Sequence, residues 1–268
     1  MSLGPLPGLD DFSAAVQPVL PLVDGLAGAS DLDSLQPRFG DCAAALALVE
    51  KMARGEGCGE WLVEGVAAID SRYPQAELFA MHVKGLGMPA YHPNAAKGTA
   101  LAYAVSERGA CHLRGAPLGE LFSGAADPQA LEGKAQLFRD HQADKAVWDS
   151  ACLCYFPGYG MKLKELWQLV TAATSFDYPA VADLELLGER VSTLARMFNL
   201  WEGFSRAQDT LPARNLSQPM AGGPAEGQVV DLAPMLDEYY RIVGWDQNGV
   251  PTPERLRALG LERLLEAA

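Results

Sequence analysis

The chain has 268 residues, of which 49% are hydrophobic and 21% charged, and it carries a formal net charge of −13. Such a composition is typical of soluble globular proteins, and the length allows one large domain or two smaller ones. The acidic charge argues against nucleic acid and anionic membranes as partners, because binding to phosphate groups requires a basic surface. No stretch approaches the ~20 apolar residues of a membrane-spanning helix, and the start of the chain lacks the features of a signal peptide.

The chain contains five cysteines, an odd number for a chain of this size. This pattern favours reduced thiols in a cytoplasmic protein over a framework of disulfides. The cysteines are scattered and do not form the four-ligand sets of a zinc site or an iron–sulfur cluster. They are Cys42, Cys58, Cys111, Cys152 and Cys154.

Helical periodicity dominates the chain, and strict alternation over strand lengths is nearly absent. Asp41 and Thr252 are placed as helix N-caps, Asp127-Pro128 reads as a cap followed by proline, and Gly55 is placed to end the first helix. Only residues 79–83 resemble a strand, and residues 203–227 read as a loop. We therefore predict an all-α fold with at most a minor strand, and helices over residues 42–52, 61–69, 95–107, 127–148, 163–173, 181–198, 231–240 and from 252 onward.

A candidate catalytic side chain lies in residues 108–114, which read Arg-Gly-Ala-Cys-His-Leu-Arg. His112 can donate or accept a proton near neutral pH. From its position alone, a structural histidine is the commoner interpretation.

A second candidate site is the run Asp149-Ser150-Ala151-Cys152-Leu153-Cys154. A single Cys-x-Cys is a weak metal signal, so on residue type alone Cys152 and Cys154 are better interpreted as small buried side chains. Phosphate-binding loops, nucleophile elbows and kinase signatures are not found in the sequence.

Several runs, in the same order along the chain, resemble the aldehyde ferredoxin oxidoreductase family. The family's AMHVKGLExPAY run is met by residues 80–91, and its RGACHLR run by residues 108–114. Its EGFSRxxDTLPxR run is met by residues 202–214, and its LDEYYxxxGWDxxGxPT run by residues 236–252.

The resemblance implies a tungsten- or molybdenum-bis-pterin and one 4Fe-4S cluster in the parent enzyme, without choosing between the two metals. It implies that Asp149 accepts hydrogen bonds from pterin N–H groups and that Leu153 belongs to the same binding motif. Cys154 would be the fourth cluster ligand, and His112 would transfer a proton beside the metal. The end of a further pterin motif is matched by Gly8, Leu9 and Asp10.

The chain also departs from the family pattern. Gly87 stands where glutamate is usual, Cys152 where glycine is usual, and Pro5 where the first pterin motif begins with aspartate. The family's other cluster cysteines and its β-rich N-terminal domain are not in this sequence. We therefore expect the isolated chain to be inactive and free of cofactors.

We predict two packed helical units, with residues 1–76 as the remainder of a middle domain and residues 77–268 as the C-terminal domain. The expected parent oxidises small aldehydes to carboxylic acids and passes electrons to ferredoxin. Its partners would include the absent N-terminal pterin-binding domain. A related acyl-thioester reductase and a cofactor-free helical interaction module remain open alternatives. Exposed apolar surface near His112 and Cys154 should make the isolated chain self-associate, and both residues should line one cavity with Asp149.

Overall fold

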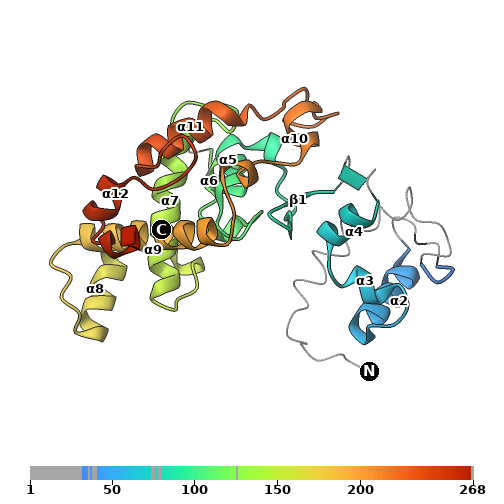
Figure 1. Ribbon diagram of the computed structural model, residues 1–268, viewed down its shortest axis with the longest axis horizontal. Coiled ribbons are helices and arrows are strands. Elements are labelled where there is room, and N and C mark those ends of the chain that lie inside the picture. Colours follow the sequence, from blue (N-terminus) through green and yellow to red (C-terminus); the bar gives the residue numbers. More distant parts are fainter. Residues whose placement is uncertain are drawn as a thin grey trace.

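The computed structural model describes residues 32–266, apart from 36, 38–40, 74–75, 78–79 and 125. Helices dominate this part of the chain, and its one sheet is a two-stranded hairpin. The prediction of a mostly α-helical fold is confirmed (Figure 1). Within the described residues, no helix is both long enough and apolar enough to cross a membrane.

The first helix, α2 (Cys42–Arg54), begins and ends where the sequence predicts. The side chain of Asp41 accepts a hydrogen bond from the backbone N–H of Ala44 at 3.0 Å, and Gly55 ends the helix in the left-handed conformation. The helix predicted over residues 61–69 is instead two short helices, α3 (Gly59–Leu62) and α4 (Val66–Arg72). Gly65 separates them with a φ of 80°, which a continuous helix does not accommodate.

The strand-like segment forms a tight hairpin rather than a single strand. β1 (His82–Val83) pairs antiparallel with β2 (Leu86–Gly87), and Val83 lies opposite Leu86. Lys84 and Gly85 have φ values of 51° and 82°, as a type I′ turn requires. The sequence analysis missed β2 because a two-residue strand is too short to show alternation.

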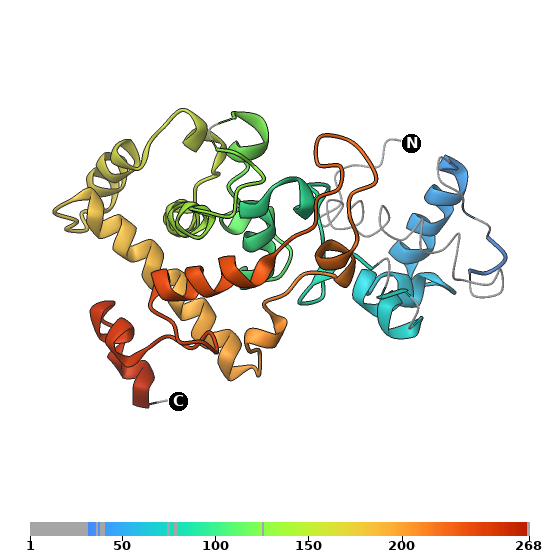
Figure 2. The ribbon, with the colours of Figure 1, turned by 90° about the horizontal axis from the view of Figure 1, so that it is seen from above.

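The largest apolar core surrounds α5 (Lys97–Val105), in which every residue is buried. The helices α7 (Lys134–Ser150) and α11 (Leu232–Val243) contribute side chains to this core, and α9 (Val181–Trp201) packs against α7 (Figure 2). α7 begins later than the cap at Asp127 predicts. Asp127 instead accepts a hydrogen bond from the N–H of Gln129 at 2.9 Å within a turn, and Gly133, with a φ of 75°, directly precedes the helix.

A further core lies where the C-terminal half of α7 meets α9 and α8 (Leu163–Thr174), around Trp148, Leu166 and Leu184. The predicted loop over residues 203–227 contains two short helices. The remaining elements are η2 (Pro93–Ala95), η3 (His112–Arg114), α6 (Gly119–Phe122), η4 (Phe156–Tyr159), η5 (Arg206–Gln208), α10 (Ala213–Ser217), α12 (Pro253–Ala258) and η6 (Glu262–Glu266).

The helices α2, α3 and α4 lie at one end of the molecule and the later helices at the other (Figure 1, Figure 2). Buried side chains between Leu32 and Ala80 form an apolar cluster distinct from those around α5 and α7. One polar contact between the ends joins His82 Nε2 of β1 to Asp70 Oδ2 of α4 at 3.4 Å. A domain boundary near residue 76 remains a prediction.

Candidate functional site

The segment that contains His112 lies along one face of α7. Gly115 has a φ of 128°, and a Cβ at this position would come within 2.9 Å of the Cα of Gln142 and 2.8 Å of the ring of Phe138. Glycine is therefore required for this close approach. The contact brings the turn His112–Arg114 against the helix that ends near Asp149.

Arg114 joins this segment to the end of α7. Its Nη1 donates to Oδ2 of Asp149 at 2.7 Å, and its Nε lies 3.5 Å from Oε1 of Glu107. The side chains of Arg114 and Asp149 are 36% and 47% exposed, so the pair is open to solvent. Asp149 therefore lies beside the segment of His112, although the two are distant in sequence.

The His112 side chain is half-buried, with its ring centroid 5.4 Å from that of Tyr91. Burial lowers the pKa of His112, and the nearby positive charges of Lys145 and Arg108 lower it further. At neutral pH the imidazole is therefore mainly uncharged, and one ring nitrogen is able to accept a proton.

The C-terminus of α7 carries the second predicted run. Cys152 adopts a φ of 56°, which is unusual for a residue other than glycine. The N–H of Leu153 donates to the carbonyl of Trp148 at 3.1 Å, which closes the helix end.

Cys152 and Cys154 are exposed free thiols, so their interpretation as small buried side chains is wrong. Leu153 between them is 44% exposed. Ala151 packs against the core around Trp148, Leu166 and Leu184, whereas Leu153 does not.

The predicted site residues are thus placed in part. Asp149, Leu153 and Cys154 follow one another at the end of α7, and His112 lies in the turn that packs against this helix. No contact between His112 and Cys154 is observed in the described residues. Gly8, Leu9 and Asp10 lie outside them.

No three histidine, cysteine or acidic side chains are grouped as metal ligands in the described part of the chain. A cubane cluster usually requires four thiolates. Cys154 could therefore supply one thiolate to a cluster whose other ligands come from outside the described residues.

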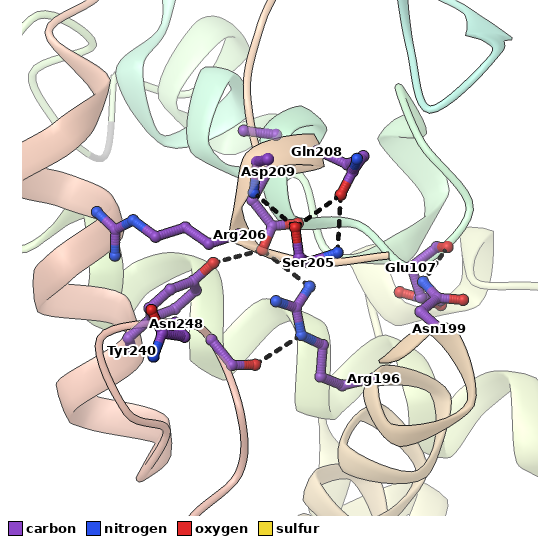
Figure 3. A network of polar contacts seen from close by, with 12 residues as sticks. Glu107, Arg196, Asn199, Ser205, Arg206, Gln208, Asp209, Tyr240 and Asn248 are labelled. Carbon is purple, nitrogen blue, oxygen red and sulfur yellow. Dashed lines mark hydrogen bonds and ion pairs between the residues drawn. The ribbon is translucent and has the colours of Figure 1, made fainter. Parts of the chain in front are cut away.

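Three of the runs that carry the family resemblance meet at a buried carboxylate (Figure 3). Asp209 lies 2.8 Å from Lys84 Nζ through Oδ1 and 2.8 Å from Arg196 Nη1 through Oδ2. The hydroxyl of Tyr240 donates to Oδ2 as well. The side chains of Lys84 and Arg196 are 2% and 3% exposed, Tyr240 is 2% exposed, and the side chain of Asp209 is fully buried.

The same cluster fixes two loops. Arg196 Nε donates to the carbonyl of Gly249 at 2.8 Å, and Asn199, one turn further along α9, donates to the carbonyl of Glu107 at 2.7 Å (Figure 3). The sequence analysis did not single out these side chains. The signal available to it was the charged residues inside the matched runs, which the structure shows to be interior contacts.

Comparisons with known proteins show to which family the chain is similar. The family model described as aldehyde ferredoxin oxidoreductase, domains 2 and 3, matches residues 22–261. A tungsten-containing aldehyde ferredoxin oxidoreductase of Pyrococcus furiosus is 36% identical over 229 residues, which is 84% of this chain and 38% of that protein. One of Thermococcus kodakarensis is 34% identical over 233 residues, with 85% and 38% covered.

More distant matches were also found. The WOR-like subunit of an aliphatic sulfonate oxidoreductase from Pyrococcus furiosus is 26% identical over 241 residues, covering 83% of this chain and 35% of that protein. The solved structure of the active-site complex BamBC of benzoyl coenzyme A reductase, bound to 1,5-dienoyl-CoA, matches with a TM-score of 0.70. It shares 19% identity and covers 96% of this chain and 45% of that chain, so this likeness shows the fold alone.

The chain spans 38% of the length of the tungsten-containing relatives named above. The family model matches residues 22–261, which is nearly the whole of this chain. The chain therefore belongs to the aldehyde ferredoxin oxidoreductase family, over the part described as domains 2 and 3.

Proposed function

We propose that this chain is the part of an aldehyde-oxidising enzyme that binds one pterin and supplies one cluster ligand. The observation that supports the proposal is the arrangement at the end of α7. An exposed carboxylate at Asp149 is held beside the turn of His112 by Arg114, and the exposed thiol of Cys154 follows directly.

The residues fit the groups that the family resemblance implies. A carboxylate only accepts hydrogen bonds, which suits the N–H edge of a pterin. Arg114 occupies Oδ2 of Asp149, and Oδ1 has no hydrogen-bond partner among the described residues, which leaves it to a pterin of a tungsten- or molybdenum-bis-pterin. The exposed thiol of Cys154 is accessible to a 4Fe-4S cluster. Gly8, Leu9 and Asp10 would contact the other pterin.

The reaction converts an aldehyde and water into a carboxylic acid, two protons and two electrons. When bound, the metal–pterin group and the cluster supply the two-electron oxidation and the transfer of electrons to ferredoxin. A ring nitrogen of the uncharged His112 accepts one of the protons. Asp149 and Arg114 orient the pterin edge, and Leu153 excludes water from it.

The proposed partners are the N-terminal pterin-binding domain, ferredoxin and a small aldehyde. Leu113, which is 56% exposed, and Leu153, which is 44% exposed, present apolar surface in the segments that carry Arg114 and Asp149. The N-terminal domain would cover this surface, and without it the chain would self-associate. Free thiols and transfer to ferredoxin favour a cytoplasmic location.

The test uses the full-length protein, purified without oxygen and analysed for metal, pterin and iron. We expect Asp149→Ala to lower the pterin content and Cys154→Ser to abolish the spectroscopic signal of the cluster. Cys42→Ser is the matched control, because Cys42 is also an exposed free thiol but lies in α2. Wild-type protein that contains neither metal nor pterin would contradict the proposal and favour a cofactor-free module.

A further inference from the structure

We propose that Lys145 is a positioning residue for the candidate site, which fixes the segment of His112 on α7 and places a buried positive charge beside it. This inference depends on the proposed function for its role in catalysis. Its structural basis is independent of any bound group.

One face of α7 contacts the whole segment. Phe138, Gln142, Lys145 and Asp149 follow one another at intervals of three or four residues, so their side chains share one side of the helix. The first two pack against Gly115, and the last pairs with Arg114. Lys145 therefore lies between the apolar contact and the exposed ion pair.

Lys145 binds the segment through its backbone. Its Nζ donates to the carbonyl of His112 at 3.1 Å and to that of Ala116 at 3.3 Å. The two carbonyls flank residues 113–115, so one ammonium group fixes this part of the segment at both ends. The ammonium group also lies over the ring of Tyr155, with Nζ 4.9 Å from the ring centroid.

The buried ammonium group of Lys145 contacts uncharged groups, namely two backbone carbonyls and an aromatic ring. The residue is 5% exposed, and no carboxylate lies within ion-pair distance of its Nζ in the described residues. Burying an ammonium without a paired carboxylate lowers stability relative to a well-packed hydrocarbon side chain. A lysine at this position does two things that a hydrocarbon side chain cannot do. It donates hydrogen bonds to two carbonyls, and it creates a positive potential at the turn.

That potential acts on His112. Burial lowers the pKa of Lys145 to about 8, against the opposing effect of Cys111, Asp144 and Asp149, so the amine remains mostly charged at pH 7. After burial, the charge of Lys145 is the largest cause that lowers the pKa of His112.

Other charged groups near His112 contribute less or are paired. Arg108, on the same segment, acts in the same direction as Lys145 but is exposed. Arg114 is neutralised by Glu107 and by Asp149 of α7. The ring of Tyr91 lies beside that of His112, with the two ring centroids 5.4 Å apart. Lys145 is thus the buried positive charge that, in addition to burial, favours the uncharged imidazole.

The test is a histidine titration followed by NMR on this chain. In the wild type, the ring signals of His112 should shift in two steps, one below pH 6.5 and a second, smaller one near pH 8 as Lys145 loses its proton. Lys145→Met should remove the second step and raise the midpoint of the first. Lys145→Arg should remove the second step but keep the low midpoint, because the charge is retained.

Lys164→Met is the matched control, since Lys164 is an exposed lysine on α8 and its removal should leave both steps unchanged. The inference fails if wild-type His112 lacks the second step, a measurement that requires no variant to fold. It also fails if folded Lys145→Met keeps the wild-type midpoint.

Activity of the full-length enzyme separates this inference from the proposed function. Lys145→Met should lower kcat with little change in KM and should shift the acid limb of the pH profile upward. If the NMR results are as expected but Lys145→Met and His112→Gln retain full kcat, Lys145 still positions the turn, and the catalytic assignment of His112 is wrong.

Discussion

Arg114 and Asp149 are 35 residues apart in the chain, yet Nη1 of Arg114 lies 2.7 Å from Oδ2 of Asp149. Both side chains are partly exposed, and Arg114 is also close to Glu107. An ion pair in such a position contributes little to stability, because water and salt screen it. Its importance lies in holding the carboxylate of Asp149 beside the turn of His112.

The first prediction concerns this pair. Arg114→Gln should lower the free energy of unfolding by less than ~1 kcal/mol, the range of exposed ion pairs. Urea denaturation at low and high salt, with Asp149→Asn and the double variant, measures the coupling. Arg54→Gln is the control, because Arg54 forms an exposed pair with Glu50 at 2.6 Å. A loss several times larger for Arg114 than for Arg54 would show a structural role for this pair.

Local signals in the sequence predicted the helix ends where one side chain or one glycine decides them. Asp41 and Thr252 cap their helices as expected, and Gly55 ends α2. The helix start predicted at Asp127-Pro128 is wrong. Asp127 caps only a turn, and α7 begins after Gly133, which has a positive φ. Gly65 has the same effect between α3 and α4.

The site was predictable only through the family resemblance. His112 and Asp149 were singled out by their motifs, but nothing local indicates that Arg114 joins them or that Lys145 lies beneath the turn. Both contacts depend on how α7 packs against residues more than thirty positions earlier. The apolar composition of this run likewise reveals neither the left-handed conformation of Cys152 nor the exposure of Cys154.

The second prediction concerns the buried carboxylate of Asp209. Asp209→Asn leaves Lys84 and Arg196 with no buried negative charge, and breaking such a cluster costs about 3–5 kcal/mol. Tyr240→Phe removes one hydrogen bond and should cost less, about 1–2 kcal/mol. Thermal or urea unfolding checks both. Asp237→Asn is the control, because this carboxylate pairs with Arg206 at the surface. Equal losses for Asp209 and Asp237 would contradict the prediction.

The third prediction concerns the crossing of α7 and α9. A Cβ at Gly188 would lie 2.1 Å from the carbonyl oxygen of Ala143, a backbone atom that cannot yield easily. Gly188→Ala should therefore destabilise the protein by at least about 1–3 kcal/mol, as overpacking does. Gly119→Ala is the control, since a Cβ there comes no closer than 3.4 Å to Ser123 Oγ. A shift of the unfolding midpoint for Gly188→Ala no larger than for Gly119→Ala would show that the helices separate without cost.

The fourth prediction concerns Cys152, whose φ of 56° is the conformation that glycine adopts most easily. Cys152→Gly should stabilise the chain by about 1 kcal/mol, because the left-handed conformation strains a residue with a Cβ. Cys152→Ala keeps the strain and should give no such gain. Urea denaturation under reducing conditions compares the two. Stabilisation by alanine equal to that by glycine would assign the effect to the thiol rather than to the backbone.

The fifth prediction concerns acid sensitivity. Burial is the largest cause that lowers the pKa of three histidines, His92, His112 and His141, below the usual value of about 6.5. On acidification the unfolded chain therefore takes up these protons before the folded chain does. The stability contributed by the uncharged rings is complete above about pH 6.5 and is lost as the pH falls through the lower pKa values of the folded state.

The melting temperature should consequently begin to fall below pH 6.5, before most carboxylates titrate. His141→Gln should make this fall shallower, because it removes one of the three rings without touching the turn of His112. A melting temperature that is constant between pH 6.5 and pH 5 in the wild type, or a slope unchanged by His141→Gln, would contradict the assignment of this acid sensitivity to the half-buried histidines.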